Sequence, residues 1–325
     1  MHAATDHAAA RGHLRHAIAV PAAISGFLAA RGHWDQSAAL HHSALAAARQ
    51  ADDRPGEADA LSELGVLQRE TGDYRAAAAT LTRALALYRD IDDQPGQAYA
   101  LNELGFLHVL TGDYPAATAC YQQALVLVRE LGDRRGQAWT LAERGLVQHL
   151  TGDHPAAAAS QRQALALFRD LGHQLGQAHA LNDLGLVQQE TGDYPAAAAS
   201  HHQALALFGD LGNRLGQAEA LNRLGELSLR TSAAGKACDQ HTRALAIARD
   251  IRAAPEEARA LEGLGRAHLQ DRNHDQGLAC LRHALTIYQR IGAPAAKRVR
   301  ESLRKASSPE STERPDLGVI TPTPG

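Results

Sequence analysis

The sequence predicts an all-α fold, built as an array of about seven stacked helix pairs. Three observations lead to this prediction. A set of small and apolar residues recurs every 40 residues, and each unit contains two amphipathic segments separated by turn residues. Aromatic residues make up only 4% of the 325 residues while hydrophobic residues make up 45%, so the apolar content is mostly Ala and Leu. Such a composition favours closely packed helices over a β-sheet.

The 40-residue period runs through the chain without an insertion. The recurring Leu stands at Leu61, Leu101, Leu141, Leu181, Leu221 and Leu261, and the recurring Gly at Gly65, Gly105, Gly145, Gly185, Gly225 and Gly265. A weaker copy precedes them, in which Trp34 corresponds to Tyr74 and Ala44 corresponds to Ala84. We therefore divide the chain into units 17–56, 57–96, 97–136, 137–176, 177–216, 217–256 and 257–296.

The third unit illustrates how each helix pair is predicted. Apolar spacing indicates a first helix over about 97–110, and Gly112 permits the left-handed residue that ends it. Asp113 is a suitable N-cap for the second helix, and Pro115 fits its first turn because a missing N–H costs nothing there. The second helix continues to about residue 130.

The recurring Gly lies within the first helix, where it costs about 1 kcal/mol relative to Ala. We interpret it as a site where the neighbouring backbone approaches closely. The small residues expected opposite it are Ala77, Ala117, Ala157 and Ala197. One unit would bury apolar surface worth roughly 10–20 kcal/mol, whereas ordering its residues costs about 1–2 kcal/mol each. Units are therefore expected to fold only when stacked.

The ends and one unit depart from the pattern. We expect residues 1–16 to form a tail or frayed helix, residues 293–306 a basic capping helix, and residues 307–325, rich in Ser, Pro and Thr, a disordered tail. Unit 217–256 has Ser232 and Ala233 where its relatives have Gly and Asp, which predicts a looser turn that acts as a hinge.

The repeated residues resemble the tetratricopeptide signature. They are Leu61, Leu64, Gly65, Gly72-Asp73-Tyr74, Ala77 and Ala84. The 40-residue period, longer than the usual 34, is similar to the repeats of the Leu-Gly-Asn and kinesin light chain families. The resemblance implies a right-handed superhelix whose first helices line a concave groove that binds peptides or proteins.

A narrower resemblance joins Phe27-Leu28, Gly32-His33-Trp34, the TGDYPAAAAS phrases and 260–265. These segments resemble the C-terminal repeat region of actinobacterial STAND-type (NB-ARC) ATPase regulators. No ATPase motif accompanies them, because Gly235-Lys236 lacks both the earlier Gly, where Arg230 stands, and the following Ser or Thr of a phosphate-binding loop.

No catalytic or metal-binding constellation is predicted, and no cofactor. The acidic residues are interpreted as scattered on exposed helix faces. His41, His201 and His241 share one repeat position and are interpreted as hydrogen-bonded packing residues, and Cys120 and Cys280 as small packing residues. We therefore expect a protein that is not an enzyme.

Charge and cysteine content restrict the possible partners and the cellular compartment. The net charge of −3 offers no excess of basic residues for nucleic acid or an anionic membrane, and no apolar run is long enough for a membrane span. The residues after Met1 lack the basic and apolar segments of a secretory signal, and the three Cys make no disulfide framework. These features favour the cytoplasm.

The resemblance assigns the groove to positions on the first helices. The candidate peptide-binding residues are Tyr99, Asn102, Phe106, Trp139, Leu146, His149, His179, Asn182, Gln189, Asn222 and Arg230. Their aromatic members form a candidate anchor pocket. The recurring Asn can both donate to and accept from the backbone of an extended peptide. Its alternative interpretation is a helix cap or a contact with water.

Two departures limit what the resemblance implies. Residues such as Val66 and Phe106 follow the recurring Gly where the Leu-Gly-Asn pattern has Asn, so the specific partner contacts of that family do not transfer. The carboxylate clamp of chaperone-binding tetratricopeptide domains needs Lys and Asn where this chain has Ser62 and Val66, so a chaperone C-terminus is not predicted as the partner.

The main hypothesis is a non-catalytic scaffold that binds a peptide or protein segment in the groove. The alternative is the sensor arm of a STAND-type signalling or transcriptional regulator, acting with an ATPase or regulator module encoded elsewhere. A phosphatase-type tetratricopeptide protein is disfavoured because residues 1–16 are too short for its N-terminal helical bundle. An RNA-reading repeat is disfavoured because the groove has no regular ladder of basic residues.

Overall fold

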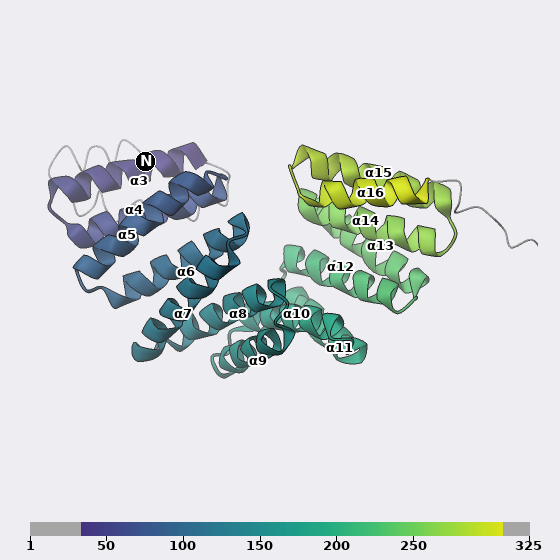
Figure 1. Ribbon diagram of the computed structural model, residues 1–325, viewed down its shortest axis with the longest axis horizontal. Helices are drawn as coiled ribbons and strands as arrows, with labels where there is room; N and C mark the ends of the chain where they lie inside the picture. Colours follow the sequence, from purple (N-terminus) through teal and green to yellow (C-terminus); the bar gives the residue numbers. More distant parts are fainter. Residues whose placement is uncertain (1–33, 308–325) are drawn as a thin grey trace, which may run out of the picture. The chain divides into compact units, whose positions relative to one another are not determined.

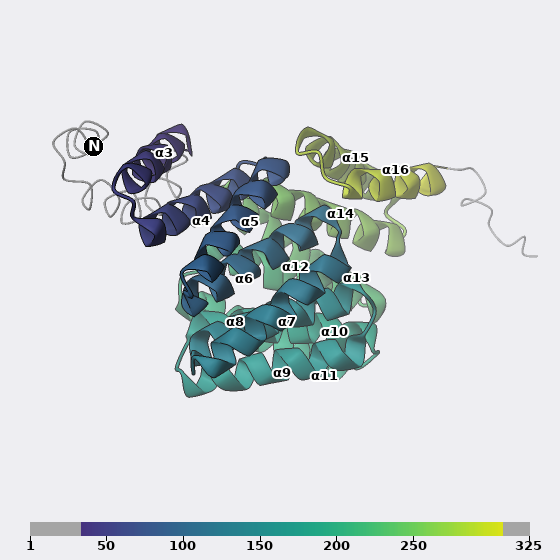
Figure 2. The ribbon, with the colours of Figure 1, turned by 60° about the vertical axis from the view of Figure 1, so that its left-hand side comes forward.

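The computed structural model describes residues 34–307, which contain fourteen α-helices and no strand (Figures 1 and 2). The predicted all-α helix-pair fold is therefore confirmed. The chain divides into two compact units, 1–176 and 177–325, and each is described by itself. The predicted tail 1–16 lies outside the described residues, as do all residues of the predicted tail 307–325 except Ser307, and the first half of repeat 17–56.

The described part of the first unit, from residue 34, contains seven complete helices. They are α3 (Trp34–Gln50), α4 (Arg54–Glu70), α5 (Tyr74–Asp90), α6 (Gln94–Thr111), α7 (Tyr114–Glu130), α8 (Arg134–Leu150) and α9 (His154–Asp170). The helices from residue 174 onward are α10 (Gln174–Glu190), α11 (Tyr194–Asp210), α12 (Arg214–Arg230), α13 (Ala234–Asp250), α14 (Ala254–Gln270), α15 (His274–Arg290) and α16 (Ala295–Ala306). None of these helices is long and apolar enough to cross a membrane.

Helix length is more uniform than the sequence suggested. Every described helix has 17 residues except α6, with 18, and α16, with 12. The predicted first helix of 97–110 starts too late, because Asp93 already caps α6 by accepting a hydrogen bond from Gly96 N at 3.1 Å. Pro95 occupies the first turn. The repeat therefore consists of two nearly equal halves of about 20 residues each.

The turn between α12 and α13 keeps the geometry of its relatives. Ser232 adopts the left-handed conformation with φ 58°, and Ala233 N donates to Ser228 O at 2.8 Å. The corresponding turn at Asp73 has the same hydrogen bond to Gln68 O at 2.9 Å. The looser turn predicted here is wrong. The substitutions remove only the favourable glycine and the side-chain cap, which Ala233 cannot supply.

The mid-helix Gly of each 40-residue repeat lies directly against a large side chain of the second helix of that repeat. Gly65 faces Leu81, Gly105 faces Tyr121 and, further along the chain, Gly225 faces His241. A Cβ on Gly105 would lie 2.7 Å from the tyrosine ring, which is too close. The predicted close approach is present, but its partner is this side chain, four residues beyond the recurring Ala.

First helices of neighbouring repeats contact one another within each unit. Helix α4 contacts α6, and α6 contacts α8, while α12 contacts α14 in the second unit. The first helices thus form a layer of their own, and the second helices pack against it. At the C-terminal end α16 packs against α15 and buries Val299 completely. Side chains on the outer face of the first-helix layer are available to form a binding surface.

Restoring the consensus residues in the α12–α13 turn should stabilise the protein. We expect Ser232→Gly and Ala233→Asp together to raise the free energy of unfolding by roughly 1–2 kcal/mol, because the left-handed residue loses its Cβ strain and the new carboxylate caps α13. Urea denaturation of the two proteins measures the change. An unchanged midpoint would mean that this turn is not limiting for stability.

Candidate functional site

A groove of about 790 Å³ lies in the first unit, where helices α6 and α8 come together. Four predicted residues line it: Tyr99, Asn102, Phe106 and Trp139. The remaining lining residues are Arg69, Pro95, Ala98, Glu103, Val128, Leu131, Asp133, Gly136 and Glu143. The Tyr99 side chain is 41% exposed, which is unusual for a large aromatic residue in a well-packed repeat. The groove therefore presents aromatic surface to solvent.

Trp139 is held in place by other rings of the first unit. Its ring meets Phe168 edge-on with 4.9 Å between centroids, and it meets His173 edge-on at 5.7 Å. Phe168 is completely buried, so it provides a rigid support. Trp139 is thus positioned before any ligand arrives, which reduces the entropy cost of binding.

Asn102 lies at the bottom of the groove and is half-buried. Its Oδ1 accepts a hydrogen bond from Thr140 Oγ1 on α8 at 3.1 Å. This contact fixes the orientation of the amide between the two first helices that form the groove.

The predicted site residues leave out the charged lining residues Glu103, Asp133 and Glu143. Arg69 also lines the groove, at the repeat position shared by the predicted residues His149 and Gln189. The Arg69 guanidinium lies over the Phe106 ring, 4.6 Å from its centroid, and 3.3 Å from Glu103 Oε2. Burial raises the pKa of Glu103, and the repulsion of nearby Glu63 adds to this effect. The signal was present in the sequence, because Glu63, Glu103 and Glu143 are spaced by one repeat.

Two predicted residues of the first unit do not line this groove. Leu146 is half-buried, and His149 packs its ring against His154 with 5.4 Å between centroids.

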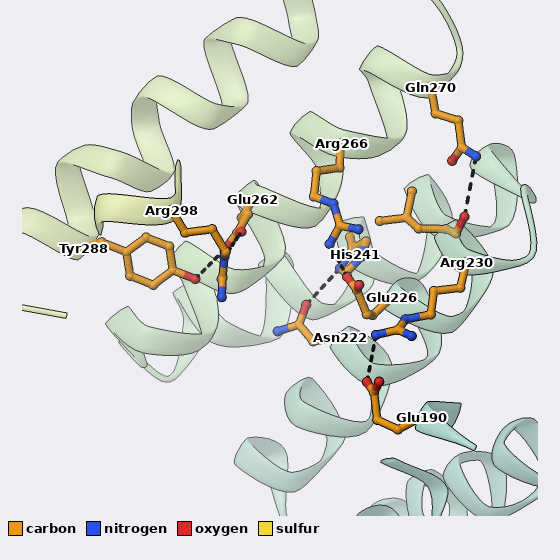
Figure 3. Close-up of polar contacts among 11 residues, drawn as sticks. Glu190, Asn222, Glu226, Arg230, His241, Glu262, Arg266, Gln270, Tyr288 and Arg298 are labelled. Carbon is orange, nitrogen blue, oxygen red and sulfur yellow. Dashed lines mark hydrogen bonds and ion pairs between the residues drawn. The ribbon is translucent and has the colours of Figure 1, made fainter. Parts of the chain in front are cut away.

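The second unit carries a separate cavity of about 660 Å³, lined by Gln189, Asn222 and Arg230 among others. Its surface is crossed by ion pairs that join neighbouring helices (Figure 3). Arg230 binds Glu190 at 2.7 Å across one repeat. The same kind of contact joins Arg266 to Glu226, and Arg298 to Glu262 at 2.8 Å. Most charges on this face are therefore neutralised within the protein.

Comparisons with known proteins agree with this architecture. The model of the tetratricopeptide repeat family matches residues 22–90 and 96–170. No curated protein sequence is significantly similar to the chain. Residues 22–90 and 96–170 are tetratricopeptide repeats.

Solved structures with the same fold include several tetratricopeptide repeat proteins. A STAND ATPase with a tetratricopeptide repeat sensor from Pyrococcus horikoshii has a TM-score of 0.64 and 15% identity, and the match covers 82% of this chain but only 40% of that chain. The Rap conjugation gene regulator of plasmid pLS20, solved in complex with the Phr* peptide, has a TM-score of 0.63 and 15% identity over 86% of this chain and 74% of that chain. A repeat protein from Parabacteroides merdae gives 0.60 and 16%, covering 90% and 99%. At these identities the likeness shows the fold alone.

The two asparagines predicted for the groove in the second unit, Asn182 and Asn222, are core residues. Asn222 is 1% exposed, donates to Glu256 Oε2 at 2.8 Å and contacts His241 Nδ1 at 3.0 Å. Asn182 is also buried and contacts His201 Nδ1 at 2.9 Å. Their burial contradicts the predicted contact with a peptide backbone, because their amides are already used inside the helix stack.

Two of the three remaining predicted residues of the second unit also lie partly or fully inside. Gln189 is buried, and His179 is half-buried with its ring edge-on to Phe208 at 5.1 Å between centroids. Burial lowers the pKa of His179. Arg230 alone of this group is exposed, and it is held by Glu190.

The interpretation of His201 and His241 as hydrogen-bonded packing residues is confirmed. Because Asn Oδ1 can only accept, each Nδ1 carries the proton and donates it. Burial lowers the pKa of His201 to about 3 and that of His241 to about 4, from an ordinary value of 6.5. Both rings are therefore neutral in the folded protein at physiological pH.

These two histidines should make the repeats less stable in acid. The unfolded chain takes up a proton at each ring below pH 6.5, whereas the folded state does not until its much lower pKa is reached. The stabilisation is therefore complete above pH 6.5 and is lost as the pH falls toward 4. Between pH 7.5 and 5 the loss is roughly 2 kcal/mol per histidine.

The measurement is urea denaturation at both pH values, for the wild type and for the variant His201→Gln/His241→Gln. Gln161 occupies the same repeat position, so the site accepts glutamine. The variant should lose less stability in acid. Burial raises the pKa of Asp183 to about 6, so protonation of Asp183 stabilises the folded protein as the pH falls. This effect is the same in the wild type and the variant and cancels when the two are compared. Equal losses of stability in the wild type and the variant would contradict the assignment of the acid sensitivity to His201 and His241.

Proposed function

We propose that this protein is a non-catalytic scaffold that binds a peptide segment of a partner protein in the groove of the first unit. The observation that carries the proposal is the aromatic groove itself. Tyr99, Phe106 and Trp139 project from two neighbouring first helices into one opening of about 790 Å³. Binding sites for small ligands and side-chain anchors have volumes of this order.

Aromatic residues in such a position are typical anchors of protein interfaces. Tyr and Trp provide a large contact area at low entropic cost and are enriched among the residues that dominate binding energy. The Rap regulator solved with the Phr* peptide supports the proposal, because a protein of this fold there holds a peptide.

Binding without catalysis fits the chemistry of the lining residues. They include carboxylates and one guanidinium, but no Ser, Thr, Cys, His or Lys that would supply a nucleophile beside them. The cysteines of the chain, Cys120, Cys238 and Cys280, are all free thiols. We place the binding activity in the cytoplasm, where thiols stay reduced.

The test is selection of random twelve-residue peptides displayed on phage against the immobilised full chain. Selected peptides, synthesised and labelled with fluorescein, should bind the wild type and bind the variants Tyr99→Ala and Trp139→Ala at least tenfold more weakly, because each substitution removes an aromatic anchor. Fluorescence anisotropy gives the dissociation constants.

Val126→Ala is the matched control, because Val126 is 53% exposed on α7 and does not line the groove. Because Tyr99 is more exposed than Trp139, Tyr99→Ala is less able to disturb folding. Loss of binding in this variant shows that the effect of Trp139→Ala is not only a folding defect. Peptides that bind wild type and both aromatic variants equally would overturn the proposal, as would a selection that enriches nothing.

A second candidate is the sensor arm of a STAND-type regulator. It rests on the similarity to the Pyrococcus horikoshii protein, whose tetratricopeptide repeats form a sensor beside an ATPase, and of which this chain spans 40%. A P-loop ATPase encoded beside this gene would be the partner to test. Its ATP hydrolysis should change when the purified chain and a selected peptide are added together, and an unchanged rate would contradict this candidate.

A further inference from the structure

A column of carboxylates runs along the first helices of the first unit. Glu63, Glu103 and Glu143 occupy the same position in α4, α6 and α8. All three are half-buried, and two of them, Glu103 and Glu143, line the groove together with the aromatic rings. The column therefore brings negative charge into a partly dry, aromatic surface, where electrostatic interactions are stronger than in water.

Maintaining these carboxylates has a cost. Burial raises the pKa of Glu63, to which the repulsion of Asp59 adds, and burial likewise raises the pKa of Glu103. A raised pKa means that the environment disfavours the charged form in the unliganded protein. Arg69 already lowers the pKa of Glu103 in part, and a second cation beside Glu103 would offset more of this penalty. The groove therefore gains more from a cationic ligand than an exposed acidic surface would.

Arg69 shows how the groove receives a guanidinium. Its side chain is 12% exposed, lies over the Phe106 ring at 4.6 Å, and reaches Glu70 at 2.9 Å and Glu103 at 3.3 Å. One aromatic face and two carboxylates thus surround a single cation, which combines cation–π attraction with charge pairing. One repeat later the position of Arg69 is taken by the apolar Val109, while Trp139 and Glu143 line the groove.

The second unit provides the contrast. There the carboxylates Glu190, Glu226 and Glu262 each face an arginine from the next repeat or from α16. In the groove of the first unit, Arg69 is the one cation against Glu103, Asp133 and Glu143 among the lining residues. Asp133 also caps α8, accepting from Gly136 N at 2.9 Å. The groove thus carries an excess of negative charge that the second unit's surface does not.

We propose that the groove of the first unit selects peptides that carry an arginine or lysine side chain beside an apolar residue. The cation would lie against Trp139 and Tyr99, within reach of Glu103 and Glu143, and the apolar neighbour would cover the exposed Leu131. The inference rests on the proposed function and specifies the chemistry of its ligand.

The experiment uses the best peptide from the display selection and a copy in which each arginine is replaced by citrulline, its neutral isostere. Both are titrated against the full-length wild type and against the variant Glu103→Gln/Glu143→Gln. We expect citrulline to weaken binding to the wild type about tenfold, equivalent to roughly 1.4 kcal/mol, and to weaken binding to the variant less than threefold. Raising the salt concentration should weaken binding of the arginine peptide to the wild type.

The control variant Glu130→Gln/Asp170→Asn removes the same number of charges from exposed positions on α7 and α9, and should behave like the wild type. Thermal denaturation establishes that the glutamine variant is folded. We expect the glutamine variant to stay folded, because neutralising the half-buried carboxylates removes their desolvation cost.

The outcomes separate this inference from the proposed function. Selected peptides that depend on Trp139 but lack arginine and lysine, or that bind the glutamine variant as they bind the wild type, would overturn the inference and leave the function standing. A selection without any peptide that depends on Trp139 and Tyr99 would reject the function itself. Selected peptides that carry lysine and no arginine would still support the inference. In that case each lysine, rather than each arginine, is replaced by its neutral analogue, norleucine.

Discussion

The contact between a glycine of the first helix and a large side chain of the second helix holds each helix pair together. Gly105 receives the ring of Tyr121, and Gly225 receives that of His241. Any Cβ at these glycines would collide with the ring, so the approach of the two helices is set by the missing side chain. The cost of a helical glycine, about 1 kcal/mol, is offset by burial of a complete large side chain, such as Leu81, Tyr121 or Leu281.

This contact leaves the outer face of the first helices free to vary. The same framework carries an aromatic, acidic groove in the first unit and a network of Arg–Glu pairs in the second. The difference comes from a few positions per repeat. Where Phe106 follows the recurring glycine, Glu226 and Arg266 follow it in later repeats and pair with each other. The residues that pack the helices and most of the residues that give each surface its chemistry thus occupy different positions of one repeat.

The repeat period made the fold predictable, because the caps, the left-handed turn residues and the packing glycines return at fixed spacing. Where the pattern was broken, as at Ser232, the prediction of a looser turn was wrong. Backbone hydrogen bonds such as that from Ala233 N to Ser228 O keep the turn in place without the favoured side chains. The start of α6 was missed by about one turn because Asp93 lies outside the apolar periodicity that located this helix.

The candidate site was only partly predictable, because the sequence does not show which side chains the core already uses. Tyr99, Phe106 and Trp139 were found from their repeat positions. The carboxylate column was overlooked, since Glu63, Glu103 and Glu143 look like ordinary exposed acids when each is considered alone. Their meaning depends on burial and on the neighbouring rings, which only the packed helices reveal.

The three asparagines at one repeat position show why the groove is where it is. In the repeats whose second helix carries a buried His201 or His241, the core needs an acceptor for the ring N–H, and Asn182 and Asn222 turn inward to supply it. In the third repeat the corresponding ring is that of Tyr121, and Asn102 instead meets Thr140 and lines the groove. A buried histidine thus diverts the asparagine from the surface to the core. Core packing and surface exposure therefore compete for this position, and in the third repeat the asparagine lines the groove.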